Sequence, residues 1–287
     1  MMIAHGDGSN GKNVLLDTLK ELLGDYYATL PPAALMAQRY ELDPERPTAV
    51  AASLAGARIV VTSESREGKR LDVTTVKQHT GNKYMTARRM RENPFTFEVT
   101  HKLWLMTNHR PALDHLDEAL RGRLHLVPFD RRWNRPGHPE HDPALPDGDP
   151  GLLDKLKVEA EGILAWLVAG AIAYAREGLE PPAEVTRTTR AYFLEQDPVG
   201  RWLEGFEPSD PKKGPLASEL YENFRGWCSA EDESAELSMK AFASALERRG
   251  VIKAATNAGK RYGLRARRGG EGSAMANDGE PLAADLL

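Results

Sequence analysis

A glycine-rich turn near the amino end constrains this chain more than any other feature. Residues 6–13 are GDGSNGKN, and they lie between a short apolar run, Met1–Ala4, and a helix-like run that starts at Val14. Glycines let the backbone turn its amide groups inward, and the positive end of a following helix dipole adds attraction for anions. The pattern predicts a strand, a phosphate-binding loop and a helix, as in nucleotide-binding α/β folds. A tight strand-to-helix turn without a ligand is the alternative.

Individual loop positions have expected roles if the loop binds ATP. Lys12 is expected to reach the β- and γ-phosphates. Asn13 stands where the usual pattern has Ser or Thr, whose hydroxyl binds Mg²⁺; its side-chain carbonyl is a hard oxygen ligand of weaker fit. The predicted nucleotide-binding residues are Gly6, Asp7, Gly8, Ser9, Asn10, Gly11, Lys12 and Asn13.

Composition narrows the class of protein. With 287 residues, 41% of them hydrophobic and 28% charged, the chain suits one large or two medium globular domains. The single Cys228 has no CxxC partner, so we expect a core thiol in a reducing cytoplasm and no zinc site. The longest apolar run, 162–175, is shorter than the roughly 20 residues that span a bilayer. A cytoplasmic protein without a membrane segment is predicted.

Charge is unevenly distributed along the chain. The net charge is −4, but residues 58–132 hold 15 basic against 9 acidic residues, and residues 248–268 hold 8 basic residues and no acids. Either segment could meet a nucleic-acid backbone or simply form a solvated basic face.

The apolar runs indicate a buried parallel sheet in residues 1–134. Three short runs, 59–62, 103–106 and 124–129, are separated by helix-length segments. Nearly continuous apolar strands of this kind are typical of sheets with helices on both faces. We therefore expect a P-loop nucleotide-binding α/β sandwich in this first domain.

The remaining chain divides into four expected segments. Residues 135–151 are rich in Pro and Gly and predict a surface loop or lid, and residues 152–205 a helical region that packs on the core. In residues 206–268, a helix over 216–229, a helix capped by Ser238 and a basic hairpin around 257–259 indicate a winged helix. Residues 269–287 predict a disordered tail. The candidate DNA contacts of the winged helix are Lys240, Lys260 and Arg261.

Polar side chains at later strand ends extend the site. Glu64 follows the strand 59–63 and could polarise a water molecule and help to hold Mg²⁺, or merely end a strand in solvent. Asn108 follows the strand 102–107 and could position the attacking water. Arg121 and Arg123 precede the third strand, where one arginine could project into the nucleotide of a neighbouring copy.

The order of these motifs resembles the superfamily 3 helicase module of phage and plasmid DNA primases, the group that includes poxvirus and satellite-phage primase-helicases. The resemblance runs from residue 3 to about 265. It rests on GDGSNGKN, VVTSESREGKRLD, VKQHTGN, TARRM, KLWLMTNHRP, DEALRGRLHLVPF, EAEGILAWLVAGAIAYAREGLEPP and LYENFRGWC. It implies an AAA+-like fold, ATP and Mg²⁺ as cofactors, and helicase activity in DNA replication.

The resemblance also implies residue roles. Lys12 is the nucleotide lysine, Glu64 the catalytic carboxylate and Asn108 the sensor, with Arg123 as the arginine finger and Arg121 as second choice. It assigns single-stranded DNA binding in the centre of a ring to the basic segment 77–102, in which aromatic residues are interleaved. The candidate contacts are Lys77, Lys83, Arg88, Arg89 and Arg91.

The resemblance finally implies partners: single-stranded and replication-fork DNA, further copies of the chain in a ring, probably hexameric in this family, and a separate primase or polymerase. The family usually carries a domain before the phosphate loop, whereas five residues precede Gly6 here. A minimal gene product or a truncated reading frame would explain this. A DNA-binding remnant without motor activity, and a small-molecule kinase, are the rival interpretations.

Overall fold

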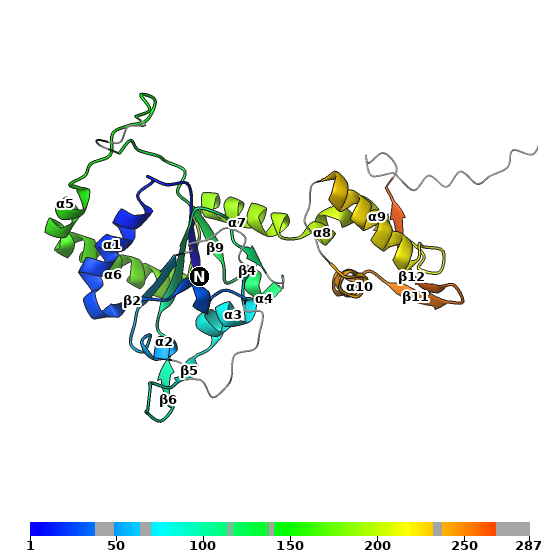
Figure 1. Ribbon diagram of the computed structural model, residues 1–287, viewed down its shortest axis with the longest axis horizontal. Coiled ribbons are helices and arrows are strands. Elements are labelled where there is room, and N and C mark those ends of the chain that lie inside the picture. The colour runs from blue at the N-terminus through cyan, green and yellow to red at the C-terminus, as the bar shows by residue number, and fades with distance from the viewer. Residues whose placement is uncertain are drawn as a thin grey trace, which may run out of the picture. The chain divides into compact units, whose positions relative to one another are not determined.

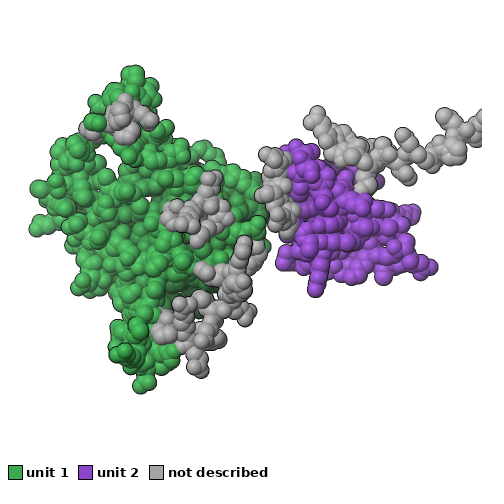
Figure 2. Space-filling view, viewed as in Figure 1, with its two compact units in different colours: residues 1–196 green, residues 197–287 purple. Residues whose placement is uncertain are grey.

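The computed structural model describes residues 1–37, 49–63, 70–113, 116, 118–135, 137, 141–231 and 237–267 (Figure 1). It forms two compact units, residues 1–196 and 197–287 (Figure 2). The sequence analysis placed a boundary at 205/206, so the helix 198–203 falls in the second unit rather than in the first. Glu64 and the segment 269–287 lie outside the described residues.

A five-stranded parallel sheet forms the centre of the first unit. Its strand order is β2-β3-β7-β1-β9, and every neighbouring pair is parallel. The strands are β1 (Met2–His5), β2 (Tyr27–Thr29), β3 (Ile59–Ser63), β7 (Lys102–Thr107) and β9 (His125–Pro128). Ile3, Val60 and Leu126 are fully buried. The expected parallel sheet of a mixed α/β fold is confirmed, and its strands coincide with the apolar runs.

Helices cover both faces of this sheet. On one face, Leu16 and Leu19 of α1 (Lys12–Leu23) pack with Val61 of β3. On the other face, Val60 joins a cluster with Val76 of α3 and further residues of α3 and α7. Alternate residues of β3 thus serve opposite layers, because successive side chains of a strand point to opposite faces. The helices α3 and α7 span Val73–Gly81 and Ala183–Glu195.

Short elements complete the first unit. Two pairs of short strands lie outside the main sheet, a parallel pair β4-β8 and an antiparallel hairpin β5-β6. These elements, with the short helices, are η1 (Gly24–Tyr26), η2 (Pro32–Ala34), α2 (Ala49–Ala52), β4 (Arg70–Leu71), β5 (Tyr84–Ala87), β6 (Phe95–Glu98), β8 (Ala112–Leu113) and α4 (Glu118–Arg121).

The helical segment after residue 151 is two helices rather than one. α5 (Leu152–Val158) packs against α1, and α6 (Ala160–Glu177) follows after a bend of 76° at Glu159. Leu167 of α6 packs against the α1 cluster, yet no residue of Ala160–Glu177 is fully buried, and Trp166 is 72% exposed. Among the described helices, none is by itself long and apolar enough for a bilayer, although α5 and α6 taken together meet that length and composition.

The second unit has its own aromatic core. Trp202 packs edge-on against Phe224 and Phe242, and Cys228 is buried in the same cluster, as expected. Ser238 accepts a hydrogen bond from the Ala241 amide, which confirms the predicted helix cap. The elements are α8 (Pro198–Leu203), β10 (Phe206–Pro208), α9 (Ala217–Ala230), α10 (Met239–Arg248), β11 (Lys253–Thr256), β12 (Gly259–Tyr262) and β13 (Leu264–Ala266).

Candidate nucleotide site

The glycine-rich loop connects the carboxyl end of β1 to the amino end of α1. Gly6 has φ +151°, and a Cβ there would lie 2.3 Å from the Phe129 carbonyl oxygen, so a side chain would displace the loop from β9. Gly11 caps α1 with φ +85°, which glycine adopts without strain. The loop is therefore shaped by two positions where glycine is required.

Lys12 and Asn108 meet beside this loop. The Lys12 ammonium donates to Asn108 Oδ1 at 3.2 Å and to the Gly6 carbonyl oxygen. Asn108 directly follows β7, and β7 pairs with β1 in parallel register from Met2↔Trp104 to His5↔Thr107. The shared carboxyl edge thus joins residues that are 96 positions apart in the chain.

The environment of Lys12 favours an anion. Its side chain is 5% exposed, and its hydrogen-bond acceptors are neutral oxygens. Burial lowers the pKa of Lys12, which the charge of Asp7 partly opposes. Burial, followed by the charges of Arg110 and Lys12, likewise lowers the pKa of His5 at the end of β1. A buried ammonium gains most from an anionic partner, and the amino end of α1 adds its dipole.

A cavity of about 220 Å³ lies on the Asn13 side of the loop. It is lined by Asn13, by Asp17 one turn further along α1, and by Thr62 and Ser63 at the end of β3. The Thr62 hydroxyl is buried with no hydrogen-bond partner among the described residues. These neutral and acidic oxygens suit a hydrated Mg²⁺ ion beside the phosphates. The other predicted metal ligand, Glu64, falls outside the described residues.

The two candidate arginine fingers lie at the opposite edge of the sheet. Arg123 comes just before β9, and its guanidinium packs over Gly81 at the end of α3, where an added Cβ would lie 2.9 Å from Nη2. The Arg121 guanidinium lies 5.3 Å from the centre of the Phe193 ring. The length of β9 separates Arg123 from the loop of its own chain by about 20 Å.

The basic segment forms a hairpin at that same amino edge. β5 and β6 pair from Tyr84↔Glu98 to Ala87↔Phe95, and β6 ends shortly before β7 begins. The connecting loop carries Arg88, Arg89 and Arg91. Lys83 lies over the Tyr84 ring, Arg89 lies over Phe95 and pairs with Glu92, and Lys77 lies on the neighbouring α3. The structure thus groups the predicted DNA contacts of the first unit.

A buried histidine pair lies close to this edge. His79 Nδ1 of α3 and His101 Nε2, just before β7, are 3.1 Å apart. Burial, then the charges of His79 and Lys102, lowers the pKa of His101 to about 4. Burial also lowers the pKa of His79. The pair is therefore neutral at pH 7.

The predicted DNA contacts of the second unit differ in exposure. Lys240 at the start of α10 and Lys260 on β12 are exposed. Arg261 is half-buried and donates to the Gly214 carbonyl oxygen at 2.6 Å, so it also supports the fold of this unit. β11 and β12 form the expected hairpin around residues 257–258.

The sequence analysis missed a second layer around the glycine loop. The segment after β9 returns to the loop: Trp133 N donates to the Ser9 carbonyl oxygen at 2.9 Å, and Arg135 Nε donates to Ser9 Oγ at 2.5 Å. The side chain of Asn10 also donates to the Phe129 carbonyl oxygen at 3.0 Å. The only signal in the sequence was the basic and aromatic run Arg131–Arg135, which has no periodicity.

Comparison with known protein families gives one match. Residues 4–123 match the family described as "Family of unknown function (DUF5906)". This segment includes the glycine loop, the Lys12–Asn108 pair and both candidate arginines.

Two curated viral proteins are similar to the chain over most of its length. "Putative helicase L207/L206" of Acanthamoeba polyphaga mimivirus is 28% identical over 235 residues, which are 77% of this chain. "Putative helicase 022R" of Frog virus 3 (isolate Goorha) is 27% identical over 233 residues, 78% of this chain. The chain spans about a quarter of each relative, 24% in both cases.

Among solved structures, two forms of the apo NrS-1 C-terminal region are similar at 12% sequence identity. One has a TM-score of 0.46 and covers 71% of this chain and 47% of its own; the other has a TM-score of 0.45 and covers 93% and 66%.

Proposed function

We propose that this chain is an ATP-dependent DNA helicase module of the superfamily 3 type, with a P-loop, AAA+-like core, which acts in the replication of phage, prophage or plasmid DNA. The observation that carries the proposal is the contact between Lys12 and Asn108 beside the glycine loop. The helicase names of both viral relatives support the same activity.

The loop and the strand ends divide the chemistry between them. Loop amides and Lys12 bind the phosphates of ATP, and Asn13 with Glu64 binds Mg²⁺, which neutralises phosphate charge. Glu64 accepts a proton from the attacking water, and Asn108 holds that water in line with the γ-phosphate. Asn108 needs no large movement for this role, because its amide already lies against the lysine that binds the phosphate.

The arginine at the far edge requires a second copy of the chain. Arg123 lies too far from its own loop to reach a phosphate there. An arginine from a neighbouring copy would stabilise charge in the transition state and would couple hydrolysis to assembly. A closed ring, with a hexamer as our proposal, satisfies this requirement for every copy.

DNA binding is proposed for two surfaces. The β5-β6 hairpin would hold single-stranded DNA through phosphate contacts and stacking, and move along it as ATP is hydrolysed. The second unit would bind duplex DNA as a winged helix through Lys240, Lys260 and Arg261, with α10 as recognition helix and β11-β12 as the wing. A separate primase or polymerase would act on the strand released.

Mixing two inactive variants tests the shared site. Lys12→Ala removes the phosphate-binding lysine but keeps Arg123, and Arg123→Ala does the reverse. Each variant alone should show almost no ATP hydrolysis with single-stranded DNA. An equal mixture should recover activity, because some interfaces then combine an intact loop with an intact arginine.

The control is Arg187→Ala, which removes an exposed arginine that pairs with Glu184 on α7 and should leave hydrolysis unchanged. Normal turnover by Arg123→Ala alone would contradict the shared site. DNA binding without any ATP-dependent unwinding by the unaltered chain would favour the rival interpretation, a DNA-binding protein that uses nucleotide only structurally.

A further inference from the structure

A second and larger cavity adjoins the glycine loop on the side away from Asn13. Its volume is about 440 Å³, and the loop contributes Gly8 and Ser9 to its wall. The opposite wall is the segment after β9, which we call the strap and define as residues 129–135 and 141–148. The strap contributes Arg132, Trp133 and Arg135. The loop therefore separates two cavities, one beside Asn13 and one beneath the strap.

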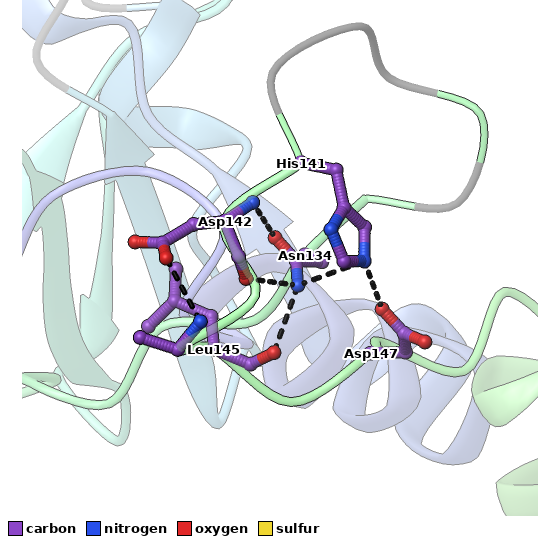
Figure 3. Close-up of polar contacts among 6 residues, drawn as sticks. Asn134, His141, Asp142, Leu145 and Asp147 are labelled. Atoms are coloured by element: carbon purple, nitrogen blue, oxygen red, sulfur yellow. Dashed lines mark hydrogen bonds and ion pairs between the residues drawn. The ribbon is translucent and has the colours of Figure 1, made fainter.

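Asn134 holds the strap in one conformation. Its side chain is 5% exposed, and its amide group donates to the carbonyl oxygens of Asp142 and Leu145, both at 2.8 Å (Figure 3). Its Oδ1 accepts the Asp142 amide at 2.9 Å. His141 closes the same cluster by a 3.1 Å contact with Asp147 (Figure 3). These contacts keep the strap folded and leave Trp133 and Arg135, on either side of Asn134, to line the cavity.

The strap is fixed to the loop at a single residue, Ser9. The backbone of Ser9 binds Trp133, and its hydroxyl binds Arg135. Ser9 itself has φ +61°, a conformation that non-glycine residues seldom adopt. The cavity wall and the phosphate-binding amides are thus parts of one hydrogen-bonded assembly.

We propose that the strap cavity binds the nucleoside part of the nucleotide whose phosphates the loop holds. Trp133 would stack on the base, and Arg135 would contact a phosphate oxygen next to the ribose. This inference rests on the proposed function and adds the residues that distinguish a nucleotide from a bare polyphosphate.

The lining of the cavity supports this occupant. A half-buried indole offers a flat surface for a base, and two arginines complement the negative charge of the adjoining phosphates. Polar groups dominate the remaining wall through Asp142, His141 and Asn134, which disfavours a purely apolar ligand. The cavity also lies next to Gly8, where a Cβ would come 3.4 Å from Arg135 Nη2, so the approach is close enough for loop and strap to hold one ligand.

Binding of ATP and of inorganic tripolyphosphate to the same variants tests the proposal. Calorimetric titration of the unaltered full chain should show ATP binding at least about tenfold more tightly than tripolyphosphate. Trp133→Ala should weaken ATP binding about tenfold and leave tripolyphosphate affinity within about twofold. Trp133→Phe should retain most of the ATP affinity, because it keeps an aromatic ring. Arg135→Ala should weaken both ligands.

Trp166→Ala is the matched control, since Trp166 is exposed on α6, and it should change neither affinity. Equal affinity of the unaltered chain for ATP and tripolyphosphate would overturn the strap proposal while keeping the loop as a phosphate site. Equal weakening of both ligands by Trp133→Ala and Trp133→Phe would also overturn it, because Trp133 would then only support the loop. Failure to bind either ligand would overturn the proposed function as well.

Discussion

The two edges of the central sheet differ in how their polar residues are held. At the carboxyl edge, Lys12 is buried and hydrogen-bonded to Asn108, 96 residues away. At the amino edge, Arg123 is half-buried and rests on Gly81, and Arg91 of the hairpin loop is exposed. One edge forms a nearly complete phosphate site, whereas the other presents cations that have no anion in their own copy to act on. The difference teaches that the fold prepares one half of a site at each edge.

Arg123→Ala should have the largest effect and would separate binding from turnover. We expect ATP hydrolysis to fall by about 10³-fold, the lower range for an arginine finger, with ATP affinity nearly unchanged. The reason is that such an arginine meets charge that develops only in the transition state. Steady-state hydrolysis and equilibrium binding, measured on the same preparation, check this. A large loss of ATP affinity would place Arg123 in the ground-state site instead.

Asn108→Ala tests the carboxyl edge. We expect hydrolysis to fall by about 10²-fold, because a poorly placed water reacts slowly. Gln78→Ala, which removes an exposed amide from α3 at the other edge, is the matched control and should retain full activity. If both variants hydrolysed ATP equally well, the Lys12–Asn108 contact would have only a structural role. Single-turnover hydrolysis distinguishes these outcomes.

The histidine pair makes the stability of the amino edge depend on pH. The pKa of His101 is lowered from 6.5 to about 4, so the unfolded chain binds a proton that the folded chain does not between these values. Stability should therefore be constant above pH 6.5 and should fall as the pH drops to 4, by about 2 kcal/mol after allowance for solvent screening.

Urea unfolding of the full chain at several pH values measures this loss. His101→Gln should show a smaller dependence on pH in that window. A variant whose stability falls as steeply as that of the unaltered chain would show that other groups titrate there.

The smallest expected effect concerns the hairpin. Arg91→Ala should weaken single-stranded DNA binding by several-fold and reduce the slope of log affinity against log salt by nearly one, as expected for one lost phosphate contact. Arg187→Ala should leave that slope unchanged. Fluorescence anisotropy over a salt series measures both. An unchanged slope for Arg91→Ala would remove this residue from the DNA surface.

Local patterns predicted much of the architecture. The apolar runs gave β3, β7 and β9 to within a residue or two, and the Asp197-Pro198 step separates α7 from α8 as expected. The predicted Ser238 cap is present. Such features depend on neighbours within a few residues, which is why a single sequence contains the information. The roles of Lys12, Glu64, Asn108 and Arg123 remain predictions.

Other features had no local signal. A continuous helix appeared to fit residues 152–178, yet the chain bends at Glu159, whose amide donates to the Leu156 carbonyl oxygen. The strap was expected only as a Pro/Gly-rich loop, although Arg135 bonds to Ser9 across 126 residues. Neither contact follows from hydrophobic periodicity, because periodicity describes the faces of an element and not its distant partners.

The sequence by itself determined a glycine loop between a buried strand and a helix, a set of apolar strands and a basic hairpin. Only the tertiary structure decided that β1 lies between β7 and β9, which brings Asn108 to Lys12 and the strap to Ser9. The physical reason is that strands buried on both faces are apolar along their whole length, so their sequences do not specify their neighbours. Neighbours are chosen by packing of the complete sheet between its helices.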